Sequence, residues 1–202
     1  MLERALSVEG LTKHSELEVL HDVARTMPVE AVVVEIGSFR GRSTLAIAEG
    51  LDAVTRPTLI AVDTFGGDPG WENRADPREA RAIFDRNTAG IEFLRVVQAS
   101  SIEAAGDLAD RSVDWVFIDA LHDYRSVVGD IRAWAPKLKP GGLLSGHDWG
   151  RAGVTDAVLR VFRPEQIEFQ HSIWMTRAQP RLRPTRVGKH AAKRLLRRYP
   201  AW

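Results

Sequence analysis

The sequence contains no cysteine, and this absence excludes several classes of protein together. Without a thiol, the chain cannot be a disulfide scaffold, bind a metal through thiolates or use a cysteine nucleophile. It also has no apolar run that approaches the roughly 18 residues of a membrane-spanning helix. Residues 1–10 lack the apolar core of a signal peptide. We therefore expect a cytoplasmic protein without a membrane span.

Acidic residues are missing from the end of the chain. Residues 181–202 contain eight Lys or Arg and no Asp or Glu, whereas residues 1–180 hold the other 20 bases and all 27 acids, a net charge of about −7. The tail also has an apolar stripe with a spacing of four residues, at Val187, Ala191, Leu195 and Tyr199. Such a helix would dock on its own domain or on a second subunit of a homodimer, unless the tail is disordered. Binding to nucleic acid or to an anionic membrane surface is the alternative.

The 202 residues, 44% hydrophobic and 27% charged, are typical of one globular domain with terminal appendages. We expect an N-terminal helical segment at 1–30, a domain at 31–178 and a basic tail or helix at 179–202. Within the domain, β-branched runs alternate with amphipathic stretches, which is the pattern of an α/β fold. Ser15 with Glu18 predicts the capped start of a leading helix.

The domain contains five runs with strand character, at 31–36, 58–63, 93–97, 113–119 and 142–147. Asp76 and Pro77 predict the start of one intervening helix, and residues 123–134 form another. Two further runs, 166–169 and 173–177, lie too close together for a helical crossover and predict an antiparallel hairpin. The prediction is a seven-stranded, mostly parallel sheet with a reversed last strand and helices on both faces.

The strongest local signal is Val-Val-Val-Glu-Ile-Gly-Ser-Phe-Arg-Gly-Arg-Ser at 32–43, a strand that leads into a glycine-bracketed turn and a helix. Gly37 and Gly41 let a ligand approach the backbone. Their G-x-x-x-G spacing differs from the G-x-G-x-x-G of nicotinamide dinucleotide sites. Glu35 would repel a pyrophosphate but suits the ammonium group of an amino-acid ligand. The alternative, a structural loop without a ligand, is disfavoured by the polar residues at other strand ends.

Polar residues also follow the second and third expected strands. The carboxylate of Asp63 can accept hydrogen bonds from both hydroxyls of a ribose. Ser100 and Ser101 follow the third strand and can meet an adenine edge. These positions and the glycine turn predict a nucleoside-containing ligand at one edge of the sheet.

The fourth and fifth strands end in Asp119-Ala120-Leu121-His122 and in His147-Asp148. Asp119, His147 and Asp148 would supply two carboxylates and an imidazole at the same edge, a usable divalent-metal site. Oxygen-rich ligation favours Mg²⁺, while the imidazole also suits Mn²⁺ or Fe²⁺. A base mechanism without a metal, or a site that has lost activity, is the alternative.

These residues resemble the class I S-adenosylmethionine-dependent methyltransferases, with E-x-G-x-x-x-G at strand one and an acid at the end of strand two. The resemblance covers about residues 28–178 and implies their Rossmann-like fold. It implies that the methionine moiety is held by Glu35, Gly37, Ser38, Gly41 and Ser43. It also places Asp63 on the ribose and Ser100, Ser101 and Asp119 among the other cofactor-binding residues.

The strand-four Asp-x-x-His resembles the metal-dependent O-methyltransferases, both the catechol type and those acting on macrolide sugars. In the sugar-acting enzymes this motif supplies a metal ligand and a general base, matching Asp119 and His122. His147 stands where many relatives place Asp or Glu, so it is either a ligand or a second base. The resemblance implies Mg²⁺-assisted methylation of a hydroxyl, with S-adenosylhomocysteine as the other product.

The resemblance leaves the acceptor open between a sugar or glycoside, small or oligosaccharide, and a catechol or phenol. Trp71 and Trp149 would stack on such a ring or anchor their loops, and we expect specificity to lie in residues 1–14, 64–76 and 149–153. The chain lacks the Pro-Pro-Tyr motif of base-modifying amino-methyltransferases, which argues against nucleic acid. Other hypotheses are a nicotinamide oxidoreductase, disfavoured by the glycine spacing, and a non-catalytic S-adenosylmethionine- or RNA-binding module.

Overall fold

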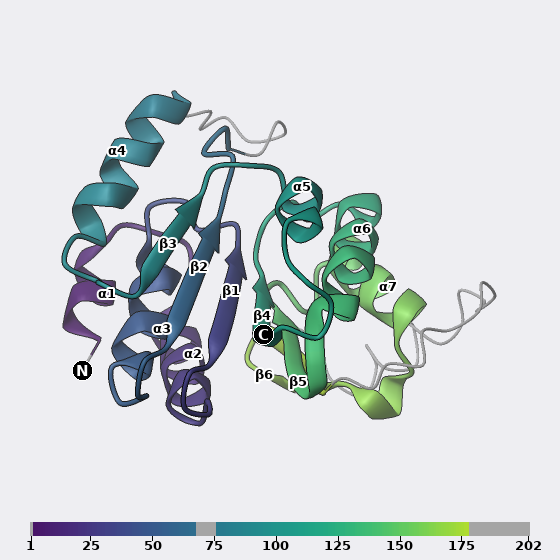
Figure 1. Ribbon diagram of the computed structural model, residues 1–202. Coiled ribbons are helices and arrows are strands. Elements are labelled where there is room, and N and C mark those ends of the chain that lie inside the picture. The colour runs from purple at the N-terminus through teal and green to yellow at the C-terminus, as the bar shows by residue number, and fades with distance from the viewer. Residues whose placement is uncertain (1, 68–75, 178–202) are drawn as a thin grey trace.

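A computed structural model of the chain describes residues 2–67 and 76–177. They form a seven-stranded sheet in the order β3-β2-β1-β4-β5-β7-β6 (Figure 1). The strands are β1 Val32–Ile36, β2 Thr58–Val62, β3 Leu94–Val97, β4 Val113–Ile118, β5 Leu138–Gly146, β6 Glu168–Gln170 and β7 Ile173–Arg177. The five neighbouring strands β3, β2, β1, β4 and β5 run parallel to one another. β7 is antiparallel to both β5 and β6. The predicted mostly parallel sheet with a reversed last strand is confirmed.

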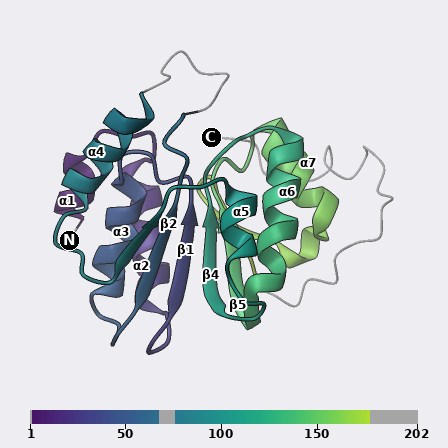
Figure 2. The same cartoon turned by 45° about the horizontal axis from the view of Figure 1, so that its top comes forward.

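Helices cover both faces of the sheet (Figure 2). They are α1 Glu3–Ser7, α2 His14–Arg25, α3 Arg42–Leu51, α4 Pro77–Asn87, α5 Ser101–Gly106, α6 Tyr124–Trp134 and α7 Ala152–Val161. Because side chains alternate along a strand, β1 contributes Val34 and Ile36 to the core under α5, α6 and α7. Val33 enters the opposite core, under α1, α2 and α3. Among the described residues, no helix has the length and apolarity to cross a membrane.

The N-terminal helix begins differently from the prediction. We expected a capping box formed by Ser15 and Glu18, but α2 begins at His14 with Lys13 as its N-cap. In a capping box, the side chain three residues after the N-cap bonds to the N-cap amide. With Lys13 as the cap, that residue is Glu16, and the Lys13 amide donates to Glu16 Oε2 at 2.7 Å. The predicted start of α4 is confirmed, since Asp76 accepts from the Arg78 amide.

Main-chain hydrogen bonds continue the sheet one residue beyond several strands. Gly37 N donates to Val62 O at 2.8 Å, and Asp63 N donates to Val97 O at 3.2 Å. On the other side of β1, Asp119 N donates to Ile36 O at 2.7 Å and His147 N donates to Ile118 O at 3.0 Å. The carboxyl ends of five strands are therefore held side by side, with their polar residues at one edge.

Candidate active site

The glycine loop after β1 surrounds a buried carboxylate. Glu35 is fully buried, and its Oε2 accepts a hydrogen bond from the Thr44 hydroxyl of α3. Burial raises the pKa of Glu35 to about 7, and contacts from the hydroxyls of Ser43, Thr44 and Ser38 only partly oppose this rise. Among the described residues, no group makes a well-formed hydrogen bond to Glu35 Oε1 or to the buried Ser38 hydroxyl. An unpaired buried carboxylate oxygen suits a cationic ligand group.

Both loop glycines are required by the backbone. Gly37 and Gly41 have φ values of 87° and 88°, in the left-handed region that favours glycine. A Cβ on Gly37 would lie 2.1 Å from the carbonyl oxygen of Asp119, and one on Gly41 would lie 2.9 Å from Thr88 Cγ2. Gly37 therefore lets the loop pass directly against the end of β4.

Asp63 anchors the glycine loop. Its Oδ2 accepts from the amides of Ser38 and Phe39 at 2.8 and 2.7 Å, and its Oδ1 accepts from the Phe65 amide at 2.6 Å. Each carboxylate oxygen has two acceptor sites, so Oδ1 retains one. Asp63 is thus placed both to hold the loop and to accept one further hydrogen bond.

Ser100 and Ser101 already have structural partners. Ser100 is the N-cap of α5, where its hydroxyl donates to Glu103 Oε2 at 2.6 Å and completes a capping box. The Ser101 hydroxyl accepts from Trp134 Nε1 at 2.9 Å and contacts Asp130. Their assignment to an adenine edge stays a prediction, and these bonds limit what either hydroxyl can offer a ligand.

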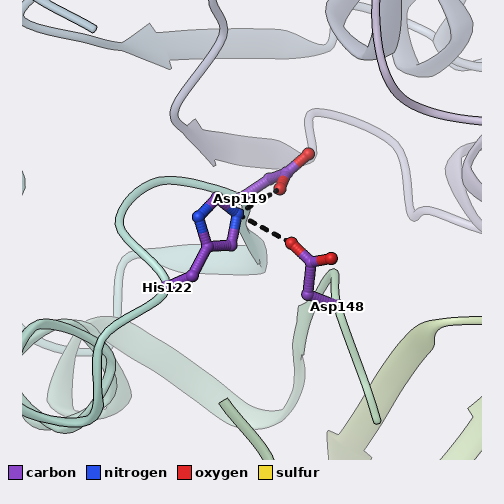
Figure 3. Close-up of side chains that lie close together, drawn as sticks. All are labelled: Asp119, His122 and Asp148. Carbon is purple, nitrogen blue, oxygen red and sulfur yellow. Dashed lines mark ion pairs between the residues drawn. The ribbon is translucent and has the colours of Figure 1, made fainter. Parts of the chain in front are cut away.

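Asp119, His122 and Asp148 meet beyond β4 and β5 (Figure 3). His122 Nε2 lies 2.7 Å from Asp148 Oδ2 and 3.9 Å from Asp119 Oδ1. One potential ligand atom from each residue lies within 4.8 Å of the others. Two carboxylates and an imidazole at such distances are a suitable donor set for a divalent cation. The group contains His122, whereas the set predicted from the sequence contained His147.

His147 lies directly beside this group. Its Nδ1 is 3.6 Å from Asp119 Oδ1 and 3.5 Å from Asp148 Oδ2. Its Nε2 points the other way, 3.1 Å from Glu16 Oε2 and 3.0 Å from the Ser172 hydroxyl. Both predicted histidines are therefore at the site, joined by two residues that the sequence analysis did not select.

The close charges shift several pKa values. Burial by itself would lower the pKa of His147. The contacts with Asp148, Glu16 and Asp119 outweigh burial and raise this pKa to about 10. Burial likewise opposes the change at Glu16, where hydrogen bonds from His147 and Ser172 lower the pKa to about 2. The bond to Asp148 raises the pKa of His122, and both histidines hold the pKa of Asp148 low despite its burial. For Asp119, burial is the main cause of a raised pKa.

The remaining candidates give mixed outcomes. Trp149 stacks on Phe169 of β6, with ring centroids 5.6 Å apart and an interplanar angle of 18°, so it anchors its loop. Trp71 and the basic tail lie outside the described residues.

The backbone of Asp148 has a φ of 60°, a left-handed conformation that Asp tolerates better than most residues.

Comparison with known proteins connects this site to one family. A family model described as a methyltransferase domain matches residues 34–149, which is more than half of the chain. The uncharacterized protein y4gI from Sinorhizobium fredii (strain NBRC 101917 / NGR234) is 31% identical over 117 residues. That match covers 57% of this chain but 13% of the relative, so the chain spans a small part of that protein.

Solved structures with low sequence identity share the fold. A candidate O-methyltransferase from Klebsiella pneumoniae gives a TM-score of 0.64 at 16% identity, over 87% of this chain and 84% of that chain. Cofactor-bound Rv0187 from MTB gives 0.63 at 16% identity, over 87% and 85% of the two chains. At these identities the likeness establishes the architecture.

Proposed function

The chain belongs to the methyltransferase domain family, among the class I S-adenosylmethionine-dependent methyltransferases, and from this membership we propose its reaction. We propose that it transfers a methyl group from S-adenosylmethionine to a hydroxyl of a sugar or glycoside, with help from a divalent cation such as Mg²⁺. The observation that carries the proposal is that two carboxylates and two imidazoles meet next to the glycine loop. They belong to Asp119, Asp148, His122 and His147.

The glycine loop fits the cofactor. Glu35 Oε1 is a buried acceptor that suits the ammonium group of the methionine moiety, and Ser38 offers a hydroxyl beside it. Asp63 Oδ1 has an acceptor site left for a ribose hydroxyl. When bound, S-adenosylmethionine supplies a methyl group that its sulfonium has already activated. Ser43 acts here through its contact with Glu35.

Asp119, Asp148 and Nδ1 of His147 would hold the divalent cation, and two carboxylates with one imidazole suit Mg²⁺ or Mn²⁺. When bound, the cation lowers the pKa of the acceptor hydroxyl. Asp148 lies 2.7 Å from Nε2 of His122, so once Asp148 served as a ligand of the cation, Nε2 would be released to take the proton from that hydroxyl. The acceptor oxygen bonds to the methyl carbon while the carbon–sulfur bond breaks, leaving S-adenosylhomocysteine.

A second assignment exchanges the two histidines. His122 belongs to the group whose potential ligand atoms lie within 4.8 Å of one another, which favours it as the ligand and His147 as the base. We prefer His122 as the base because its side chain is 19% exposed, compared with 11% for His147. Nε2 of His147 contacts Glu16 and Ser172, and its Nδ1 faces Asp119 and Asp148, an orientation that suits a ligand of the cation. If His147 is the ligand, His147→Ala weakens Mn²⁺ binding more than His122→Ala does.

The choice of a sugar hydroxyl rests on its chemistry. A phenol ionises with a pKa near 10, whereas a sugar hydroxyl is less acidic and needs more help from a cation and a base. The resemblance to catechol-type enzymes implies a lysine where this chain has His122, and the sugar-acting type implies a histidine. Catechols and phenols are the second acceptor class.

The test uses labelled S-adenosylmethionine and Mg²⁺ with parallel panels of glycosides and catechols. We expect labelling of a glycoside that depends on His122, with loss in His122→Ala. Labelling of catechols alone, unchanged in that variant, would contradict both the acceptor and the base. Binding of S-adenosylhomocysteine without turnover on any acceptor would favour a non-catalytic module instead.

A further inference from the structure

Two residues outside the family match at 34–149 meet at His147. Glu16 comes from the first turn of α2, and Ser172 from the turn between β6 and β7. Glu16 is 2% exposed although it is a carboxylate, so its contacts must compensate for burial. The N-terminal segment has a second connection near the glycine loop, because Arg42 donates to the carbonyls of Val8 and Thr12. The segment before β1 is therefore part of the site.

The hydrogen-bond pattern determines which nitrogen of His147 carries a proton. The Ser172 hydroxyl has one hydrogen, which it donates to Glu16 Oε1 at 2.6 Å. Its 3.0 Å contact with His147 Nε2 must therefore be one in which Ser172 accepts. Glu16 Oε2, 3.1 Å from the same nitrogen, is also an acceptor. Both neighbours therefore require a hydrogen on Nε2.

Because Nε2 keeps its hydrogen, Nδ1 is the nitrogen that would lose its proton when a cation binds and then offer a lone pair. Nδ1 lies 3.6 Å from Asp119 and 3.5 Å from Asp148, on the side away from Glu16. Carboxylates that fix the tautomer of a ligating histidine in this way commonly change metal affinity by 10–100-fold. An exposed acid in the first turn of α2 would stabilise the helix N-terminus as well as a buried one. The contact with His147 gives the burial of Glu16 a separate purpose.

We propose that Glu16 is a positioning residue which, with Ser172, fixes the Nε2–H tautomer of His147 and directs Nδ1 to a divalent cation shared with Asp119 and Asp148. This inference rests on the proposed metal site. It extends that site to α2 and to the β6–β7 turn, both outside the family match. Glu16 acts through His147 and does not itself contact the cation.

The test measures Mn²⁺ affinity of the full chain by electron paramagnetic resonance, with S-adenosylhomocysteine affinity measured in parallel. We expect Glu16→Gln to weaken Mn²⁺ binding at least tenfold while cofactor affinity is unchanged. Glu18→Gln on the same helix is the matched control, because the substitution removes the same charge from a side chain that is 59% exposed. Ser172→Ala leaves the charge and the α2 cap intact, and we expect it to weaken Mn²⁺ binding severalfold.

Glu16 and Ser172 act on one nitrogen, so the double variant should lose less affinity than the sum of the two single losses. Wild-type Mn²⁺ affinity in both single variants, with affinity lost in Asp148→Asn, would overturn the role of Glu16 and leave the metal site standing. A lower melting temperature in Glu16→Gln with unchanged Mn²⁺ affinity would show a helix cap only, and would also overturn it. Absence of Mn²⁺ binding in the wild type would contradict the metal site and this inference together.

Discussion

Gly37 of the glycine loop lies directly against the carbonyl of Asp119, so closely that a Cβ on Gly37 would be 2.1 Å from that oxygen. The contact joins the loop proposed for the cofactor to the first carboxylate of the proposed metal site. Asp119 follows β4 and is held by a 2.7 Å bond from its amide to Ile36, the last residue of β1. The two halves of the site are therefore fixed relative to each other by backbone contacts.

Gly37→Ala should displace the end of β4. The change adds strain from the positive φ, about 1–2 kcal/mol, and an overlap with the backbone that costs about 1–3 kcal/mol more. Gly90→Ala is the matched control, because Gly90 has a φ of 86° and no atom within 4 Å of an added Cβ. Chemical denaturation should show the larger loss for Gly37→Ala, which should also lower Mn²⁺ affinity. Equal losses in the two variants would contradict the close contact.

Cofactor affinity should depend on the ionisation of Glu35. Its pKa is raised to about 7 by burial, so below pH 7 the free protein must lose a proton before the carboxylate can pair with an ammonium group. Affinity for S-adenosylhomocysteine should therefore rise severalfold between pH 6 and pH 7.5, measured by calorimetry. Glu35→Gln should bind more weakly and lose the pH dependence. The same pH dependence in that variant would assign it to another group.

Much of the sheet could be predicted, because runs of β-branched residues are a local signal for strands and can be recognised without knowing their tertiary contacts. The order of polar residues at the strand ends then placed Glu35, Asp63 and Asp119 at one edge. The partners of each side chain were harder to predict. Ser100 with Glu103 is a capping-box pattern that the sequence contains, but the prediction of an adenine contact for Ser100 did not take this signal into account.

The contact between Glu16 and His147 had no such signal. The two residues are far apart in the sequence, and a helix with Lys13 as its N-cap does not follow the usual preference for Ser, Thr, Asp or Asn. The hydrogen on Nε2 of His147 also depends on Ser172, which lies in the turn between β6 and β7. Such contacts arise only when α2 packs against the sheet.

Methyl transfer should require a divalent cation. A chelator should abolish turnover, Mg²⁺ should restore it, and Asp148→Asn should not respond to the ion. Asn tolerates the left-handed φ of 60° at this position, so the variant removes charge without adding backbone strain. Asp156→Asn on the exposed surface of α7 is the control. Full activity in excess chelator would leave His122 acting as a base without a metal.

Asp130 of α6 should destabilise the fold at neutral pH. Burial raises its pKa to about 6, so between about pH 4 and 6 the folded state binds more protons than the unfolded state. The free energy of unfolding therefore falls as the pH rises through this range. The Asp130→Asn variant should have a free energy of unfolding up to about 2–3 kcal/mol higher than the wild type at pH 7.5. This difference should disappear near pH 4. Denaturation curves at both values check this, and equal gains would contradict it.

The most direct test is a calorimetric titration of the wild-type protein and Asp63→Ala with S-adenosylhomocysteine. The account predicts saturable binding to the wild type, weaker by at least about 1–3 kcal/mol in the variant, because Asp63→Ala loses a charge-assisted hydrogen bond to the ribose and the three main-chain bonds that hold the glycine loop. Asp52→Ala on the exposed surface should bind as the wild type does. No binding to the wild type, or equal affinity in Asp63→Ala, would contradict the placement of the cofactor at this edge of the sheet.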